Sequence, residues 1–334
     1  MTLLDQIPVA PVGQYPTPLQ ELKRLSALIG GARLWVKRDD LTGLAFGGSK
    51  TRSLSTLFGR ALAEGADTVI TCGPTTSNHV RLTAAAANQL GLKVVLVLRG
   101  SSCGAGPLQG NMLLNHMLGA RLVFAEVDSL ADLEPAMERE AHEIQARGGK
   151  PFIIPGGGYS PVGALGYVGL MQELMQQTAE AGVGIDGVVF ASGSGCIQSG
   201  LLLGALVAGV RMPVIGLTIN RRVDELEPRI RHDVEAAAAL IGLDGHLPAG
   251  AVQVLDDYLG PGYAVPSEAG IEAIDLLARM EGLLLDPCYT GKSMAGAMDL
   301  AVRRFEPGQN VIFIHTGGTP GIFSYAADLS QQRT

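Results

Sequence analysis

The stretch VVFASGSGCIQSG, residues 188–200, decides the fold class of this chain. Its first four residues are apolar without alternation, which is typical of a strand buried on both faces. A loop of small residues follows and leads into a helix-like segment. The successive N–H groups from Ser194 to Ile197 would lie at the start of that helix, where they could hold a phosphate. The stretch therefore predicts a strand, a phosphate-binding loop and a helix.

A dinucleotide-binding loop is the weaker interpretation of the same stretch. The dinucleotide fingerprint needs a third glycine where Gln198 stands, and an acidic residue about 20 positions further on, where Asn220 and Arg221 stand. We therefore favour phosphate binding alone.

Short β-branched runs alternate with helix-length segments on both sides of this stretch. Such alternation predicts an α/β fold with mostly parallel sheets covered by helices. Ligands of such folds lie beyond the carboxyl ends of the strands, where the unusual loops of this chain fall. The expected strands are 34–37, 68–72, 94–98, 121–124, 152–154, 187–191, 214–218, 252–255 and 310–315, and the expected helices are 80–90, 130–147, 197–208, 267–280 and 292–305.

Composition and charge narrow the class of protein. The chain has 334 residues, 47% apolar and 17% charged, which provides for two lobes with large aliphatic cores. The net charge of −7 argues against nucleic acid or an anionic membrane as partner. We expect the pairs Arg221-Arg222 and Arg303-Arg304 to be solvated helix faces or ends.

The expected compartment is the cytoplasm. The segment MTLLDQIPVAPVG lacks the basic and apolar regions of a signal peptide, and no run approaches the roughly 20 apolar residues that span a bilayer. No metal site is expected. Free thiols are expected rather than disulfides at four widely spaced positions, Cys72, Cys103, Cys196 and Cys288.

The loop GLAFGGSKTRSL, residues 43–54, leads into a helix-like stretch that begins at Lys50. Lys50 could be a surface lysine, a phosphate lysine of a Walker A loop, or a Schiff-base lysine with a lowered pKa. The Walker A pattern fails because Ser49 breaks it and no strand leads directly into the loop. Taken alone, the loop favours the surface lysine over the Schiff-base lysine.

The stretch TCGPTTSNHVR, residues 71–81, follows an expected strand and opens an expected helix. Ser77 and Asn78 would lie at the helix N-terminus, where free N–H groups and the dipole favour a carboxylate or phenolate. Helix capping explains one such residue, but the four consecutive polar residues 75–78 exceed what a cap requires. His79 could be a base, although a lone histidine is more often structural.

Two further loops, DPCYTGKS (286–293) and FIHTGGTPG (313–321), each follow an apolar strand. They place a tyrosine or a threonine at the carboxyl end of that strand. Tyr289 could equally be a packing tyrosine with no functional role. The segment GYAVPSE, which holds Tyr263, could equally be a plain turn.

Taken in order, these blocks make the chain resemble the fold-type II pyridoxal-phosphate enzymes, a two-lobed class similar to the β subunit of tryptophan synthase. The resemblance is strongest to the branch that contains D-cysteine desulfhydrase, L-cysteate sulfo-lyase and 1-aminocyclopropane-1-carboxylate (ACC) deaminase. It covers nearly the whole chain, through YPTPL (15–19), WVKRDDLTGLAFGGSKTR, SNHVR, PGGGYSPVGALGY, YLGPGYAVPSEAG, LLLDPCYTGKSMAG and FIHTGG.

The resemblance implies a role for each matching residue. Lys50 would carry pyridoxal 5'-phosphate as a Schiff base and move the Cα proton. The other residues implied in catalysis are Ser77, Tyr263 and Tyr289. Those implied in cofactor binding, beside Lys50, are Asn78, Ser194, Gly195, Cys196, Ile197, Thr290 and Thr316. Those implied in substrate binding are Thr76, Ser77, Asn78, His79, Tyr263 and Thr319.

Two threonines separate the branches. ACC deaminases typically carry Glu and Leu at the positions of Thr290 and Thr319, whereas desulfhydrase-like members carry threonines. A carboxylate would keep the pyridine nitrogen protonated and make a strong electron sink, while a hydroxyl leaves the ring closer to neutral. The weaker sink suits prompt loss of a good β-leaving group such as thiolate or sulfite.

The chain also departs from the family pattern. Ser49 and Ser53 replace a usual Asn and Lys around the lysine, and Cys196-Ile197 replace a Gly-Thr pair in the phosphate loop, where the N–H donors survive. Thr76 replaces a usual Gln before SNH, so the departure touches the expected carboxylate pocket.

The resemblance implies a β-eliminating lyase that converts D-cysteine, or a related β-substituted alanine, to pyruvate, ammonia and sulfide. L-cysteate sulfo-lyase and ACC deaminase stay open as alternatives, as does a non-catalytic α/β protein that binds a phosphate ligand. We expect a small lobe of residues 48–165, a large lobe of 1–47 and 166–334, and a homodimer.

Overall fold

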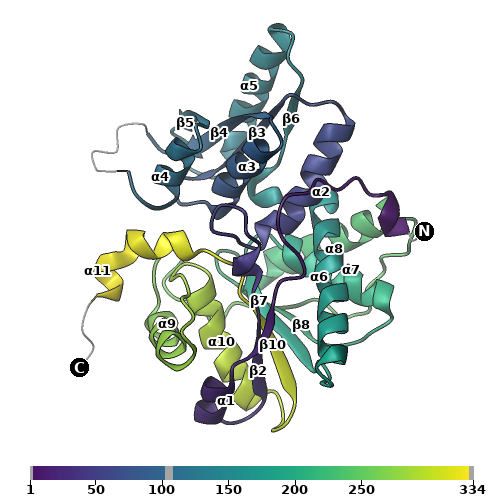
Figure 1. Ribbon diagram of the computed structural model, residues 1–334, viewed down its shortest axis with the longest axis vertical. Coiled ribbons are helices and arrows are strands. Elements are labelled where there is room, and N and C mark those ends of the chain that lie inside the picture. The colour runs from purple at the N-terminus through teal and green to yellow at the C-terminus, as the bar shows by residue number, and fades with distance from the viewer. Residues whose placement is uncertain (1–2, 102–107, 331–334) are drawn as a thin grey trace.

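The computed structural model describes residues 3–101 and 108–330 and contains two separate sheets (Figure 1). The larger sheet has the strand order β1-β2-β10-β7-β8-β9, and its neighbouring strands are parallel except for β1 and β2. The smaller sheet, at the top of Figure 1, has the order β5-β4-β3-β6 and is wholly parallel. The strands are β1 (Leu19–Glu21), β2 (Arg33–Lys37), β3 (Thr68–Pro74), β4 (Lys93–Arg99), β5 (Arg121–Ala125), β6 (Pro151–Ile153), β7 (Gly187–Ser192), β8 (Val214–Thr218), β9 (Gln253–Leu255) and β10 (Asn310–Ile314).

Helices pack against both faces of each sheet, as the predicted α/β class requires. The helices are α1 (Lys23–Ile29), α2 (Lys50–Ala63), α3 (Asn78–Gln89), α4 (Gly110–Met117), α5 (Glu134–Ala146), α6 (Pro161–Glu180), α7 (Cys196–Ala208), α8 (Val223–Leu240), α9 (Glu268–Glu281), α10 (Thr290–Arg303) and α11 (Ala326–Leu329).

Strand β7 shows why the larger sheet needs unbroken apolar strands. Val188 and Phe190 face a core shared with α6, α7 and α8, whereas Val189 between them faces a second core shared with α9 and α10. Successive side chains of a strand point to opposite faces, so a strand covered on both sides has no polar alternation. The stretch 188–200 therefore forms the strand, loop and helix that its sequence predicts.

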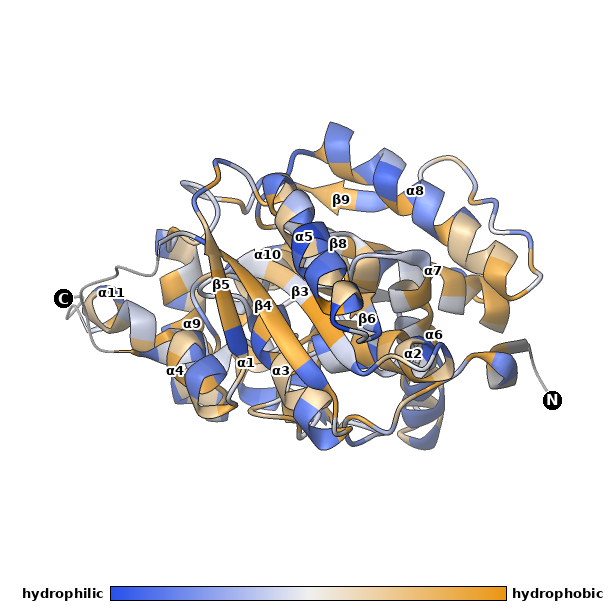
Figure 2. Ribbon diagram, turned by 90° about the horizontal axis from the view of Figure 1, so that it is seen from above, coloured by the Kyte–Doolittle hydropathy of each residue, from blue (hydrophilic) through white to orange (hydrophobic). Residues whose placement is uncertain are grey.

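The smaller sheet is built in the same way. Val69 on β3 faces the core beneath α2 and α3, and its neighbour Ile70 faces the core beneath α5. Figure 2 shows β4 as largely apolar, with the hydrophilic side of α5 turned outward. All nine expected strands are present with ends within two residues, and the fold class is confirmed.

Several elements are not predicted by the sequence, and α6 is the longest of them. Its first turns, PVGALGYVGL, are rich in glycine, which lowers helix propensity. The Ser160 hydroxyl caps the helix by accepting from the Gly163 N–H at 3.0 Å. Glycine at position 166 lets α2 approach closely, because a Cβ there would lie 2.0 Å from the Arg52 carbonyl oxygen. Close helix packing, rather than propensity, explains these glycines.

The two-lobe division at 48–165 stays a prediction. The four-stranded sheet lies within that range and the six-stranded sheet lies outside it, while α6 crosses the predicted boundary at 165.

In the described ranges, no helix has the combination of length and apolarity that crossing a bilayer requires. Three cysteines, Cys72, Cys196 and Cys288, are buried free thiols, and the predicted thiol of Cys103 lies outside the described residues.

Candidate active site

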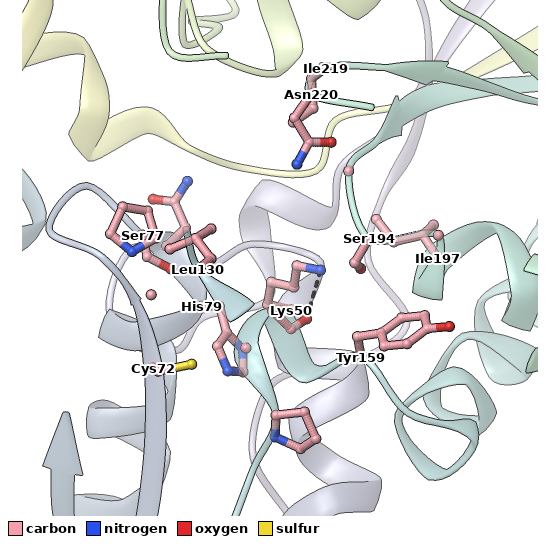
Figure 3. A pocket seen from close by; sticks show the side chains of 18 of the residues that line it. Lys50, Cys72, Ser77, His79, Leu130, Tyr159, Ser194, Ile197, Ile219 and Asn220 are labelled. Atoms are coloured by element: carbon pink, nitrogen blue, oxygen red, sulfur yellow. Dashed lines mark hydrogen bonds between the residues drawn. The ribbon is translucent and has the colours of Figure 1, made fainter. Parts of the chain in front are cut away.

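A cavity of about 500 Å³ lies where the carboxyl ends of strands from both sheets meet (Figure 3). Its walls come from residues that follow β3, β6, β7, β8 and β10, and from the start of α2. Strand ends are where ligands of such folds are expected. Ten sequence-predicted site residues line this cavity: Lys50, Ser77, Asn78, His79, Ser194, Gly195, Ile197, Tyr263, Tyr289 and Thr316.

Lys50 is the first residue of α2, and its side chain lines the cavity. The amine donates a hydrogen bond to the Gly157 carbonyl oxygen at 3.0 Å, drawn as a dashed line in Figure 3. Burial lowers the pKa of Lys50 below its usual value. A lowered pKa raises the fraction of neutral amine, which is the form that attacks a carbonyl or accepts a proton. The surface-lysine interpretation is therefore wrong.

The loop between β7 and α7 forms a cup beside this amine. Gly195, with φ of +90°, directly precedes α7, which begins at Cys196, and Ser194, Gly195 and Ile197 line the cavity. The first N–H groups of a helix have no intrahelical acceptor, and the helix dipole makes this end partly positive. Ser194 lies on the same side of Lys50 as Tyr159 in Figure 3. The cup suits a phosphate dianion.

The start of α3 forms the opposite wall. The Ser77 hydroxyl accepts from the Val80 N–H at 3.3 Å as a helix cap, so its own hydrogen is left to donate into the cavity. His79 is 3% exposed, and its Nε2 lies 2.9 Å from the Thr71 hydroxyl oxygen. Burial, with a smaller contribution from Lys50, lowers the pKa of His79 to about 3, so the ring is neutral. Neutral donors line this wall.

Two tyrosines close a third side. The Tyr263 and Tyr289 hydroxyl oxygens are 2.6 Å apart, and their rings meet edge to face. Burial raises the pKa of both phenols above their usual value, so both are protonated at neutral pH. The buried Lys292 ammonium holds the loop before Tyr263 by donating to the Leu259 and Gly262 carbonyl oxygens at 2.8 and 2.7 Å. The pair can therefore donate a hydrogen bond to a ligand as neutral phenols.

Asp286 positions Tyr289. Its carboxylate accepts from the N–H groups of Cys288, Tyr289 and Thr290 at 2.9 to 3.0 Å. The Thr290 hydroxyl donates to the same carboxylate at 2.7 Å and is fully buried. Thr290 does not line the cavity, and its hydroxyl is engaged by Asp286, so the contact with a cofactor ring stays a prediction.

Three other predicted residues also lie off this cavity. Thr319 begins a 3-10 helix, Thr319–Tyr325, that leads away from it. Thr76 is exposed and lines a small adjoining cavity, because the turn before α3 directs it outward. The Cys196 side chain is 1% exposed, its thiol faces the Gly158 carbonyl oxygen at 3.6 Å, and its backbone N–H donates to the Ser194 hydroxyl at 3.4 Å.

Sequence reasoning missed a basic group on the cavity wall. Arg221 and Arg229 both line the cavity, so the expectation of a solvated helix end is wrong for Arg221. Arg222, Arg303 and Arg304 are exposed as expected. Burial and the neighbouring Arg229 lower the pKa of Arg221.

The same wall carries Tyr159, over whose ring the Arg229 guanidinium stacks at 3.3 Å from the centroid. Two cations on one wall favour an anionic ligand. The signal that could have found Arg221 is its place just after β8, since the carboxyl ends of parallel strands define the site.

A lysine of lowered pKa beside a phosphate cup, in a fold of two parallel sheets, defines an enzyme site for a phosphorylated aldehyde. The residues fit pyridoxal 5'-phosphate: the Lys50 amine would hold the aldehyde carbon and the start of α7 the phosphate. Gly193 and Ile219 both line the cavity, and a Cβ on Gly193 would lie 3.2 Å from Ile219, so glycine at 193 lets this part of the wall pack closely.

Comparison with known proteins gives the family. The chain belongs to the pyridoxal-phosphate dependent enzymes, whose family model matches residues 11–317, and pyridoxal phosphate is its cofactor. It is 43% identical to the D-cysteine desulfhydrase of Salmonella choleraesuis (strain SC-B67) over 314 residues, 93% of this chain and 94% of the relative. A protein of Pyrococcus abyssi (strain GE5 / Orsay), provisionally named 1-aminocyclopropane-1-carboxylate deaminase, is 41% identical over 98% of this chain and 96% of its own length.

Solved structures agree on the fold. The crystal structure of an ACC deaminase homologue has a TM-score of 0.90 and 37% identity, covering 98% of this chain and 97% of the other. Diaminopropionate ammonia lyase of Escherichia coli, at a TM-score of 0.67 and 18% identity over 98% and 90%, shares the fold alone.

Proposed function

We propose that this enzyme eliminates the β-substituent of D-cysteine, or of a related β-substituted alanine, to give pyruvate, ammonia and sulfide. The observation that carries the proposal is the Lys50 amine, which has a lowered pKa and lines the same cavity as the phosphate cup and the tyrosine pair. The name of the Salmonella relative supports the substrate class.

Lys50 would hold the cofactor and then exchange the Cα proton. Pyridoxal phosphate, when bound, supplies an electron sink conjugated to the substrate Cα. The Gly157 carbonyl oxygen, 3.0 Å from the amine, would orient Lys50 after it is released. Because burial lowers the pKa of this amine, a larger fraction of it is neutral and can accept a proton.

The start of α3 would bind the substrate carboxylate. Ser77 can donate its hydroxyl hydrogen, and the helix dipole adds a partly positive field at this point. Asn78 lies beside it and would contact the cofactor's phenolic oxygen. Thr316, on the cavity wall after β10, would meet the pyridine nitrogen.

The tyrosine pair would assist the leaving group. Tyr289 is neutral because burial raises the pKa of its phenol, so it can donate a hydrogen bond to a departing thiolate. Tyr263, 2.6 Å away through the hydroxyl oxygens, would hold that phenol in place and share its proton.

A second candidate within the family is ACC deamination. The Pyrococcus relative and the ACC deaminase homologue favour it by similarity. Thr290 and Thr319 count against ACC deamination by resemblance, although neither threonine lines the cavity. L-cysteate cleavage stays open as well.

The test is a panel of substrates with one product assay each. We expect pyruvate from D-cysteine and β-chloro-D-alanine. ACC would give 2-oxobutyrate if the second candidate is right, and L-cysteate would release sulfite. Absence of pyruvate from every β-substituted alanine would overturn the elimination proposal.

A non-catalytic phosphate-binding role is tested by borohydride reduction and peptide mapping. The pyridoxyl group should appear on Lys50 and disappear in Lys50→Ala, with turnover falling at least 10³-fold. Lys23→Ala is the matched control, because that side chain is 78% exposed and distant from the cavity wall. The homodimer and the cytoplasmic location stay proposals, to be checked by light scattering and cell fractionation.

A further inference from the structure

Arg81 is a fully buried guanidinium on α3, one turn after Asn78. Its Nη2 donates to the Gly47 carbonyl oxygen at 2.8 Å, and its Nη1 donates to Asn111 Oδ1 at 3.0 Å and Asn78 Oδ1 at 3.2 Å. Its Nε has no partner among the described residues. All three acceptors are neutral, and burial alone lowers the pKa of Arg81 to about 10. The charge is therefore uncompensated by the described chain.

A guanidinium has donors only, so it decides how the amides around it are turned. Asn78 and Asn111 must both present their carboxamide oxygens to Arg81. The Asn111 Nδ2 then donates to Asn78 Oδ1 at 2.9 Å and to the Thr76 carbonyl oxygen at 2.6 Å. Asn78 Oδ1 thus accepts from two donors, and its NH₂ is the end left for the cavity that Asn78 lines.

We infer that Arg81 is a positioning residue that turns the Asn78 NH₂ into the cavity, and that its charge favours an oxyanion of the ligand there. A buried lone charge is costly, and an anionic oxygen beside Asn78 would offset that cost. The inference rests on the proposed role of Asn78 toward the cofactor's phenolic oxygen and adds the residue that sets its polarity.

The test is a pH titration of the absorption spectrum of the holoenzyme. A positive charge near the cofactor's phenolic oxygen favours the deprotonated, more negative form of the chromophore. In Arg81→Met we therefore expect the pH midpoint of the spectral change to rise by about one unit or more. The dissociation constant of pyridoxal phosphate from the reloaded protein should rise at least tenfold. Arg81→Lys keeps the charge and should shift the midpoint by less than half as much.

Asn111→Asp gives the same test without removing the guanidinium. The new carboxylate would pair with Arg81 at the 3.0 Å position and neutralise it, so the midpoint should again rise. The carboxylate would also accept from the Asn78 NH₂ and turn it away from the cavity. This second effect should raise the midpoint as well. This variant keeps the inference testable if Arg81→Met fails to fold.

Arg60→Met is the matched control. It removes one positive charge from an exposed position on α2, where Arg60 pairs only with Glu64, and should leave the midpoint unchanged. Unchanged midpoints in folded Arg81→Met and Asn111→Asp would overturn the inference while leaving the proposed function intact. A wild type that never shows a cofactor band would overturn both.

Discussion

Two buried arginines lie near Lys50 and Asn78, and they differ in the charge of their hydrogen-bond acceptors. Arg52, two residues after Lys50, donates to both oxygens of Asp39 and both of Glu173 at 2.8 to 2.9 Å. Within residues 3–101 and 108–330, Arg81, three residues after Asn78, donates only to neutral oxygens. The carboxylates raise the pKa of Arg52, whereas burial lowers that of Arg81.

The difference separates a structural charge from one that awaits a ligand. Around Arg52, the Lys37 ammonium donates to Glu173 at 2.8 Å and to the Thr17 carbonyl oxygen. Two cations and two anions therefore balance, and they tie α2 to α6 and to the end of β2. Such a cluster stabilises the position of the helix that begins with Lys50.

The largest effect on stability should come from Arg52→Met. Removing one partner of a buried network leaves Asp39 without its Arg52 partner, while Glu173 keeps Lys37, and such a loss costs about 3–5 kcal/mol. Urea unfolding of the full chain measures this free energy. Arg52→Lys should cost clearly less because it keeps the charge. A cost below 1 kcal/mol for Arg52→Met would mean that the network is not what holds α2.

The next largest effect on stability concerns His79. Like Arg81, it is a basic side chain on α3 that has no carboxylate partner among the described residues. The Thr71 hydroxyl donates to the Ile154 carbonyl oxygen at 2.8 Å, so the His79 Nε2 must donate to Thr71, and Nδ1 has no partner among the described residues. The pKa of His79 is about 3 in the folded chain, against an ordinary value near 6.5. The unfolded chain therefore binds more protons between these two values, and stability falls as pH falls through that window.

His79→Gln should remove this acid sensitivity. Between pH 7 and pH 5 the wild type should lose about 2 kcal/mol more free energy of unfolding than the variant. Urea unfolding at both pH values measures the difference. His142→Gln, at an exposed position on α5, is the matched control and should behave as the wild type. Equal acid sensitivity of His79→Gln and the wild type would show that His79 is protonated in the fold.

The same contrast shows what a sequence can and cannot predict. The stretch 188–200 predicts its strand, loop and helix because strand burial and loop composition are local properties. The balance around Arg52 depends on Glu173, which lies 121 residues away, and no local pattern indicates it. Similarly, nothing near Thr290 shows that Asp286 takes its hydroxyl, although both belong to one loop. Motifs identify residues at a site, while hydrogen-bond partners decide which of them face it.

The smallest effect on the free energy of unfolding should be that of Arg81→Met in the cofactor-free chain. This measurement decides whether Arg81 differs from Arg52 in its role. Removing Arg81 leaves the Gly47 carbonyl oxygen and Asn111 Oδ1 without donors, which costs about 1–3 kcal/mol each. It also relieves a buried lone charge, whose lowered pKa corresponds to about 3 kcal/mol. These effects oppose each other: the two lost donors cost about 2–6 kcal/mol together and the relieved charge returns about 3 kcal/mol. Urea unfolding should therefore give a net change between a gain of about 1 and a loss of about 3 kcal/mol. After reloading, the variant should gain less stability from pyridoxal phosphate than the wild type, since bound ligand stabilises in proportion to its affinity. If Arg81→Met instead costs as much as Arg52→Met and gains as much from the cofactor as the wild type, both arginines are structural and the contrast between them disappears.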